Sequence, residues 1–207
     1  VTTAEQASVT CSGFSNGAVV ATAADGIENY TYLWDNGVTT ALNENIPAGT
    51  YTVTVTDAYN CTATSTITIT EPVVLALTEV SVTMPLCNQG TNGAAVVNVT
   101  GGTLPYTLSV NNVETATMAA EGEHTLSDLS AGNYVVDVVD INGCTAQINI
   151  TVSEPDALLL TNAGTVNVSC NGLSDATATV SFSGGTAPYT LWINQNEQIT
   201  NVNTVQN

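Results

Sequence analysis

Three cysteines, at positions 11, 87 and 170, each open a copy of the same sequence pattern. A tyrosine follows each cysteine by 19 residues, in the segments NYTYLW, PYTLSV and PYTLWI. Self-similarity at a regular spacing is the signature of a repeat architecture, in which one supersecondary unit recurs along the chain. The 207 residues are therefore expected to fold as tandem units rather than as one large domain.

Later landmarks recur in the first two copies and define the length of the unit. An Ala-Gly pair opens an alternating run at Ala48 and at Ala131, a second cysteine lies 12 residues after that glycine, and a Glu-Pro pair follows. The tyrosine-to-glycine interval is 7 residues longer in the second copy, owing to an insertion within residues 111–130. One variable segment in a fixed frame is typical of a folded unit with a variable surface loop. The predicted units, called repeats 1, 2 and 3 below, are residues 1–72, 73–155 and 156–207, the last being the N-terminal part of a third repeat.

Each repeat is predicted to be all-β. Threonine alternates with valine in YTVTVT from Tyr51, and TATSTITIT from Thr62 continues in the same way. Alternation of period two with β-branched residues indicates half-buried strands. Asn142 and Gly143 lie between two such runs, and both tolerate the positive φ of a hairpin turn. Several short strands in about 80 residues predict a small immunoglobulin-like β-sandwich in each repeat.

The charge of the chain excludes several classes of function. It has 18 acidic residues, one histidine and no lysine or arginine, for a formal net charge of −18. Nucleic-acid binding needs cations that displace phosphate counterions, and attachment to anionic lipid needs a polybasic segment, so neither is expected. No apolar run approaches the ~20 residues of a membrane span, so direct membrane insertion is not expected either. A hydrophobic fraction of 43% is nevertheless enough to build cores.

The five cysteines form two candidate pairs and one remainder. In repeats 1 and 2 the second cysteine lies some 50 residues or more after the first, which is typical of a disulfide framework in an exported protein. The predicted disulfides are Cys11–Cys61 and Cys87–Cys144, and Cys170 is left unpaired. One difficulty is that a plain seven-strand meander would place the two cysteine turns at opposite ends of the unit. These pairings therefore need an even strand count, a strand that switches sheets, or another connectivity.

Two aspartates, Asp57 and Asp140, precede the second cysteine of their repeats by four residues. One hypothesis makes them calcium ligands at a junction between repeats, together with Glu71 or Glu154. The alternative is a side-chain hydrogen bond that closes the hairpin turn, as aspartate commonly provides. No DxDxDG-like ligand cluster occurs, so the turn interpretation is preferred, and no metal or other cofactor is expected.

Aromatic residues mark the predicted central strand of each repeat. Tyr30, Tyr106 and Tyr189 begin this strand, which also carries Trp34 in repeat 1 and Trp192 in repeat 3. These side chains are predicted to fill the cores, because large aromatic side chains are major contributors to core packing and the chain has few others. The alternative is an exposed aromatic platform that stacks on sugar rings.

Residues suited to catalysis are sparse. His124 is the only histidine and falls in the inserted segment of repeat 2, so a Ser/His/Asp set is not expected. No Cys-x-x-Cys pair is present for a zinc site, and the chain has no lysine or arginine to activate a thiol. The chain is therefore predicted not to be an enzyme, and it has no predicted catalytic residue.

The motifs together resemble the SprB repeat. The resemblance rests on SGG-x-x-PYT from Ser183, Y-x-Y-x-W-x-N-G from Tyr30, AGTYTVTVTDAYNCTATSTITITEP from Ala48 and VSCNG from Val168. Such repeats occur in very large surface adhesins of gliding Bacteroidota and in related exported proteins. The resemblance covers essentially the whole chain and implies export by the type IX secretion system and display in a cell-surface fibre. Repeat 2 departs from the pattern by its insertion and by VNNVET from Val110, where W-x-N-G would stand.

The function that this resemblance implies is mechanical and adhesive. Disulfide-locked, non-enzymatic units would form an extracellular filament or adhesin stalk that serves adhesion or gliding motility. The expected partners are neighbouring repeats of the same long chain, other protomers, or surface glycans. Two alternatives stay open: a carbohydrate-binding or spacer module of a secreted enzyme, and a polymerising filament subunit. Many further repeats in the same polypeptide would favour the fibre, and one hydrolase domain would favour the module.

The register of the first two repeats predicts where repeat 3 should continue. Its second cysteine would fall at position 220 or 227, so two strands and the partner of Cys170 are expected outside the 207 residues. The preferred expectation is that these residues are a processed piece of a longer protein. The alternative is that a strand from a neighbouring chain completes the third sandwich by β-augmentation.

Overall fold

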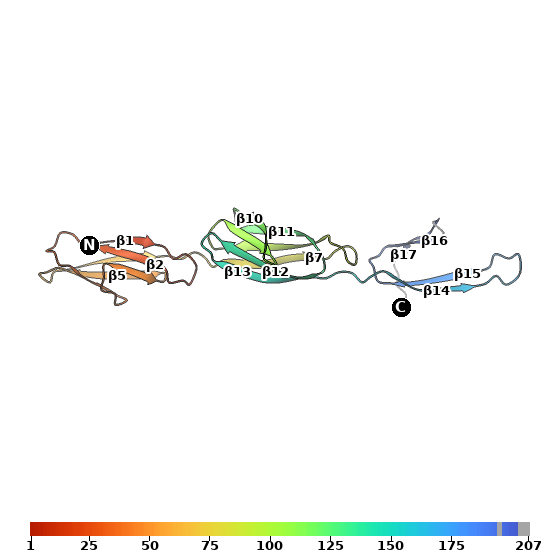
Figure 1. Cartoon of the computed structure of the whole chain (residues 1–207), viewed down its shortest axis with the longest axis horizontal. Coiled ribbons are helices and arrows are strands. Elements are labelled where there is room, and N and C mark those ends of the chain that lie inside the picture. Colours follow the sequence, from red (N-terminus) through yellow and green to blue (C-terminus); the bar gives the residue numbers. More distant parts are fainter. Residues whose placement is uncertain (194–195, 203–207) are drawn as a thin grey trace. The chain divides into compact units, whose positions relative to one another are not determined.

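The computed structural model describes residues 1–193 and 196–202, and every element assigned in these ranges is a β-strand (Figure 1). The predicted fold class, all-β with small immunoglobulin-like sandwiches in tandem, is confirmed. The chain divides into two compact units of three segments each. Unit 1 comprises Val1–Thr78, Asn98–Gly122 and Val136–Ile148, and unit 2 comprises Glu79–Val97, Glu123–Val135 and Asn149–Asn207. The repeat boundaries at residues 72 and 155 stay a prediction from the sequence register.

Repeat 1, all of which the structure describes, contains two three-stranded antiparallel sheets, β1-β2-β4 and β3-β5-β6. Alternate residues of β5, such as Tyr51, Val53 and Val55, are buried, while the threonines between them are partly exposed. The period-two pattern of the sequence thus separates an inner from an outer face. The strands are β1 Thr2–Ala7, β2 Gly17–Thr22, β3 Thr31–Trp34, β4 Leu42–Ile46, β5 Gly49–Thr56 and β6 Thr62–Ile69.

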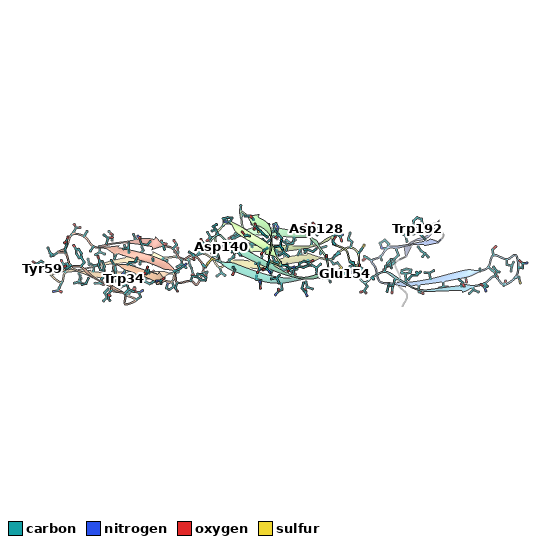
Figure 2. The ribbon with its side chains drawn as sticks, viewed as in Figure 1. Trp34, Tyr59, Asp128, Asp140, Glu154 and Trp192 are labelled. Carbon is teal, nitrogen blue, oxygen red and sulfur yellow. A yellow bond between two sulfur atoms is a disulfide. The ribbon has the colours of Figure 1, made fainter. Side chains whose placement is uncertain are left out.

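The core of repeat 1 lies between these two sheets. Its largest fully buried side chain is Trp34, which is 1% exposed, so the predicted core position of this residue is confirmed (Figure 2). The indole Nε1 donates a hydrogen bond of 3.0 Å to the carbonyl oxygen of Thr40. The apolar rings of the indole therefore pack in the core, and its polar nitrogen has a hydrogen-bond partner there. The buried neighbours come from both sheets and include Val19, Ala21, Ile46, Val53 and Ile69.

Repeat 2 has the same strand order with one strand added. Its sheets are β7-β8-β11 and β10-β9-β12-β13. The added strand is β10, an edge strand that pairs with β9 after a turn at Asn111 and Asn112, both of which have positive φ. The insertion predicted within residues 111–130 therefore forms a hairpin rather than a loop. The strands are β7 Ala76–Thr83, β8 Gly93–Thr100, β9 Tyr106–Val110, β10 Val113–Met118, β11 Gly122–Leu129, β12 Gly132–Asp140 and β13 Thr145–Val152.

Repeat 3 follows the second repeat rather than the first. Strands β14 Leu159–Val166 and β16 Tyr189–Ile193 lie 83 residues after β7 and β9, and β17 Asn196–Val202 pairs with β16 as β10 pairs with β9. Strand β14 pairs with β15 Thr177–Ser183. The predicted positions 220 and 227 lie outside the described residues.

The outer face of the β5–β6 pair is held by hydroxyl groups. Two threonine pairs hydrogen-bond across the strands through their Oγ1 atoms. Directly opposed polar side chains of this kind stabilise antiparallel pairs. The two pairs are Thr50–Thr68 at 3.0 Å and Thr52–Thr66 at 3.2 Å. A separate hydroxyl bond of 3.1 Å joins Thr3 of β1 to Ser65 of β6, and Ser65 lies on the same face of β6 as its partner Val53 lies on β5.

Candidate functional site: the cysteine turns

The opening cysteine of repeat 1 lies in the turn between β1 and β2. In this turn the Ser12 hydroxyl donates to the Glu71 carboxylate at 3.3 Å, and the Gly13 N–H donates to the other oxygen of the same carboxylate. Glu71 comes two residues after the end of β6. Cys11 is therefore held at the end of the sandwich where β6 finishes.

Repeat 2 holds its opening cysteine in the same way. The Gln89 N–H donates to the Glu154 carboxylate, and the Asn88 side-chain amide donates to the carbonyl oxygen of Pro155 at 3.0 Å. Glu154 comes two residues after the end of β13. Glu71 and Glu154, which the calcium hypothesis assigned to Asp57 and Asp140, are thus hydrogen-bonded to the opening turns instead.

The second cysteine of repeat 1 lies in the β5–β6 turn, which Asp57 closes. One carboxylate oxygen accepts hydrogen bonds of 2.9 Å from the N–H groups of Tyr59 and Cys61, and the other accepts one of 3.2 Å from Ile27. The hydrogen bonds from Cys61 and Ile27, and to a lesser extent that from Tyr59, lower the pKa of Asp57 by favouring the ionised form. Tyr59 lies at the tip of this turn, away from the core residue Trp34 (Figure 2).

Asp140 closes the β12–β13 turn of repeat 2 with the same set of bonds. Its Oδ1 accepts from the N–H groups of Asn142 and Cys144, at 2.9 and 2.8 Å, and its Oδ2 accepts from Thr103 at 2.9 Å. Asp140 is 5% exposed. The turn interpretation of both aspartates is confirmed, and no group of three His, Cys, Asp or Glu side chains suited to a metal occurs among the described residues.

The predicted pairings Cys11–Cys61 and Cys87–Cys144 are wrong. Within repeat 1 the opening turn lies where β6 ends, whereas the Asp57 turn lies where β6 begins. Eight extended residues span about 27 Å, far beyond the ~7 Å between Cα atoms that a disulfide tolerates. In repeat 2, Cys144 is bonded to Cys11 and Cys87 is an exposed free thiol, so these two cysteines are not paired either. The two cysteine turns of repeat 1 therefore lie at opposite ends of the sandwich, as a plain meander would place them.

The disulfide that does form joins different repeats. Cys11 of repeat 1 is bonded to Cys144 of repeat 2, with 5.7 Å between their Cα atoms. Beside it, the Asn142 side-chain amide donates a 3.2 Å hydrogen bond to the carbonyl oxygen of Thr10. All four residues belong to unit 1. Cys61, Cys87 and Cys170 are exposed free thiols, so Cys170 has no partner among the described residues.

In repeats 2 and 3, the tyrosine that begins the central strand donates a hydrogen bond to a nearby glycine turn. The Tyr106 hydroxyl donates to the carbonyl oxygen of Gly101, and the Tyr189 hydroxyl donates to that of Gly184 at 2.9 Å. Tyr106 is 1% exposed, and this burial, with the nearby charges of Glu121 and Asp140, raises its pKa. Trp192 is 60% exposed, so its predicted core position is wrong. His124 is half-buried in β11 rather than in a loop.

Small β-sandwich repeats that follow one another along the chain, two of them joined by a disulfide between their end turns, define a structural tandem-repeat protein. The chain belongs to the SprB repeat family, whose family model matches residues 3–39, 80–115 and 162–197, more than half of the sequence. SprB repeats occur in cell-surface proteins. Among curated proteins, none matches the chain. Within the described residues no helix is long and apolar enough to cross a membrane.

Several solved structures are similar in fold at low sequence identity. Three N-terminal domains of the Highly Immunogenic Outer Capsid protein of bacteriophage RB49 align over 90% of this chain and 70% of theirs, with 17% identity and a TM-score of 0.48. Fibronectin(III)-like modules of Clostridium thermocellum CbhA align over 74% of this chain and 95% of theirs, with 11% identity and a TM-score of 0.31. Domains 4–9 of the surface layer protein SbsC align over 88% of this chain and 37% of theirs, with 13% identity and a TM-score of 0.27.

The lowered pKa of Asp57 leads to a pH-dependent effect on stability. A carboxylate whose pKa is lower in the folded state stabilises the fold above its unfolded pKa, and this contribution disappears as the pH falls through the folded pKa. We expect Asp57→Asn to destabilise repeat 1 at pH 7, and the difference from the parent chain to shrink as the pH is lowered below about 4. Thermal unfolding of both chains across this range measures it, and a difference that grows on acidification would contradict the assignment.

The hydrogen bonds of both aspartates also predict the response to ions. Eighteen acidic residues without lysine or arginine repel one another, so added salt should raise the melting temperature. Calcium should do no more than sodium at equal ionic strength, because the carboxylates of Asp57 and Asp140 already accept backbone N–H groups. Melting curves in matched CaCl₂ and NaCl series test this, and a large stabilisation by micromolar calcium would contradict it.

Proposed function

We propose that the chain is a non-enzymatic stalk segment of an exported cell-surface adhesin or filament. Membership of the SprB repeat family supports this. The observation that carries the proposal is the Cys11–Cys144 disulfide, because it links two repeats covalently in addition to the peptide linker.

Under tension the disulfide would carry the pulling force past the folded residues between the two cysteines, which is a property that a stalk needs. When the chain is pulled from both sides of the bond, the force passes from Cys11 directly to Cys144. The residues between the two cysteines form a closed loop that carries none of the load. Much of repeat 1 and most of repeat 2 can then stay folded at forces that would extend an unbonded chain. An adhesin stalk needs this property because it must keep its length while its tip is attached.

A pulling experiment on the full chain tests the mechanical part of the proposal. With the bond intact, only residues outside the loop should extend. A reducing agent should release the sequence separation of 133 residues between the cysteines, which corresponds to roughly 450 Å of additional contour length. Cys61→Ser, which removes a free thiol but leaves the bond, is the matched control and should extend like the parent chain. Equal contour lengths with and without reductant would show that the disulfide does not carry the force around the loop.

The cellular part of the proposal needs a separate measurement. Antibodies against the chain should label intact, unpermeabilised cells along extended surface structures in electron micrographs. Deletion of the encoding gene should reduce attachment to surfaces or gliding. A lone globular secreted enzyme that carries these repeats as a module would contradict the stalk and favour the carbohydrate-binding or spacer alternative.

A further inference from the structure

We propose that the Cys11–Cys144 bond is one member of a staggered series. In a tandem array of these repeats, the opening cysteine of each repeat bonds to the second cysteine of the next repeat. The rule assigns Cys87 to the second cysteine of the repeat that follows repeat 2. It assigns Cys61 to the opening cysteine of a repeat placed ahead of repeat 1. The inference concerns the covalent pattern of the array and goes beyond the proposed stalk function, which requires only the bond observed.

The first support is that the two opening turns are built alike. The backbone N–H two residues after Cys11 and the one two residues after Cys87 each donate to the glutamate that follows the last strand of the repeat, Glu71 or Glu154. Cys87 is therefore presented at the end of repeat 2 as Cys11 is presented at the end of repeat 1. Only their state differs, because Cys11 is bonded and 4% exposed, whereas Cys87 is an exposed thiol.

The second support is that the two receiving turns are built alike. In each, the aspartate N–H donates to the carbonyl oxygen of the second cysteine at 3.0 Å, and the aspartate carboxylate accepts the N–H of that cysteine. The backbone of Cys61 is thus held by Asp57 as that of Cys144 is held by Asp140. Cys144 has received the opening turn of repeat 1, whereas Cys61 is an exposed thiol.

The third support is a hollow beside the exposed thiols of Cys61 and of Cys87. In unit 1 a hollow of ≈ 250 Å³ is lined by Cys61, Asp57, Gly26 and Tyr30, among others. By the sequence register these residues match Cys144, Asp140, Gly102 and Tyr106 of repeat 2. There Thr10 and Cys11 contact Cys144 and its neighbour Asn142, whereas Gly102 contacts the linker residues Val73 and Leu75. The part of the hollow beside Cys61 therefore corresponds to the place that the opening turn of repeat 1 takes beside Cys144.

The hollow beside the other thiol belongs to unit 2. Its volume is ≈ 420 Å³, and its lining includes Cys87 and Asn88 together with Asp156, Gly185 and Tyr189 of repeat 3. Gly185 and Tyr189 match Gly102 and Tyr106 of repeat 2. Cys87 thus faces the part of repeat 3 that corresponds to the receiving side of repeat 2.

Formation of each bond requires a named oxidant. One S–S bond forms between two cysteine sulfurs as two thiol protons and two electrons pass to the disulfide of a dithiol oxidoreductase or of oxidised glutathione. That disulfide is reduced to two thiols, so the exchange balances.

Duplication of repeat 2 within the full chain tests the rule. A second copy of residues 73–155 is inserted after Pro155, so that repeat 3 and both Glu-Pro linkers are kept. The inserted copy carries Thr91→Ser and Thr145→Ser, which give its Cys87 and Cys144 peptides masses distinct from those of the original copy. After oxidation with oxidised glutathione, the chain is digested at acidic residues without reduction, because it has no tryptic site. We expect one peptide pair that joins Cys87 of the original copy to Cys144 of the inserted copy, beside the pair Cys11–Cys144.

The outcomes are distinct. A bond between Cys87 and Cys144 of the same copy, or a free Cys87 in the original copy after oxidation, overturns the rule. Cys87→Ser in the original copy is the matched control, and it should leave Cys144 of the inserted copy free for alkylation. A second variant tests the other end and does not depend on this insertion folding. An additional copy of residues 1–72 placed ahead of Val1 should bond its own Cys11 to Cys61 of the original repeat 1, and a free Cys61 there overturns the rule.

Discussion

Replacement of Trp34 by alanine should lower the free energy of unfolding of repeat 1 by about 3–5 kcal/mol. The indole is 1% exposed between the two sheets, and its removal leaves a cavity and an unpaired Thr40 carbonyl oxygen. The neighbouring strands cannot collapse fully into a space of this size. Hydrogen exchange of the amides in β5 measures the effect, because these amides report the opening of repeat 1.

Trp192→Ala is the matched control for this substitution. The residue type is the same, but Trp192 is 60% exposed in β16. Its replacement should change stability by about 0.5 kcal/mol or less, as substitutions at exposed positions usually do. Equal losses for the two tryptophans would show that Trp34 is not the centre of the core of repeat 1.

Gly101→Ala should destabilise repeat 2 by about 2–5 kcal/mol. Gly101 has a φ of +72°, and a Cβ atom at this position would lie 2.1 Å from the carbonyl oxygen of Val74. The linker at Val73 also accepts the N–H of Gly102 at 2.7 Å, so it cannot move away without breaking that hydrogen bond. Hydrogen exchange in β9, whose first residue Tyr106 is bonded to Gly101, should rise accordingly.

Gly143→Ala is the control that separates the backbone penalty of a positive φ from the steric clash with Val74, the two causes of the destabilisation by Gly101→Ala. Gly143 has a similar φ of +83° but no atom within 4 Å of the position that a Cβ would take. Only the backbone penalty of about 1–2 kcal/mol is expected there. If Gly101→Ala cost no more than Gly143→Ala, the close approach of the Val74 linker would not be a constraint on the fold.

Local features of the fold could be predicted from the sequence because they depend on residues close together. Alternation in YTVTVT places Val53 and Val55 in the core, and the four-residue spacing from Asp57 to Cys61 produces a closed turn. Trp34 lies four residues after Tyr30, whereas Trp192 lies three residues after Tyr189, so period-two alternation places the two side chains on opposite faces of their strands. Trp34 is accordingly buried, and Trp192 is exposed like Leu33, the residue that it matches in repeat 1. Counting from the tyrosine along each strand would therefore have assigned Trp34 alone to a core.

The disulfide could not be predicted because spacing alone does not reveal at which end of a strand each cysteine lies. Cys11 and Cys61 recur at the same landmarks as Cys87 and Cys144, which is compatible with pairing inside a repeat and equally with pairing between repeats. The decisive observations are the hydrogen bonds of Gly13 with Glu71 and of Cys61 with Asp57, which fix the two turns at opposite ends of β6. The 7-residue insertion was recognisable, but its conversion into β10 depends on the positive φ of two asparagines.

The paired hydroxyls on β5 and β6 determine how this surface behaves in different media. Neither strand contains a carboxylate, and the bonds Thr50–Thr68 and Thr52–Thr66 join groups without charge. An ion pair at the same place would weaken as salt shortened the Debye length to about 8 Å or less. The two strands should therefore hold together equally well in fresh water, brine or mild acid, while the carboxylates elsewhere on the chain respond to each.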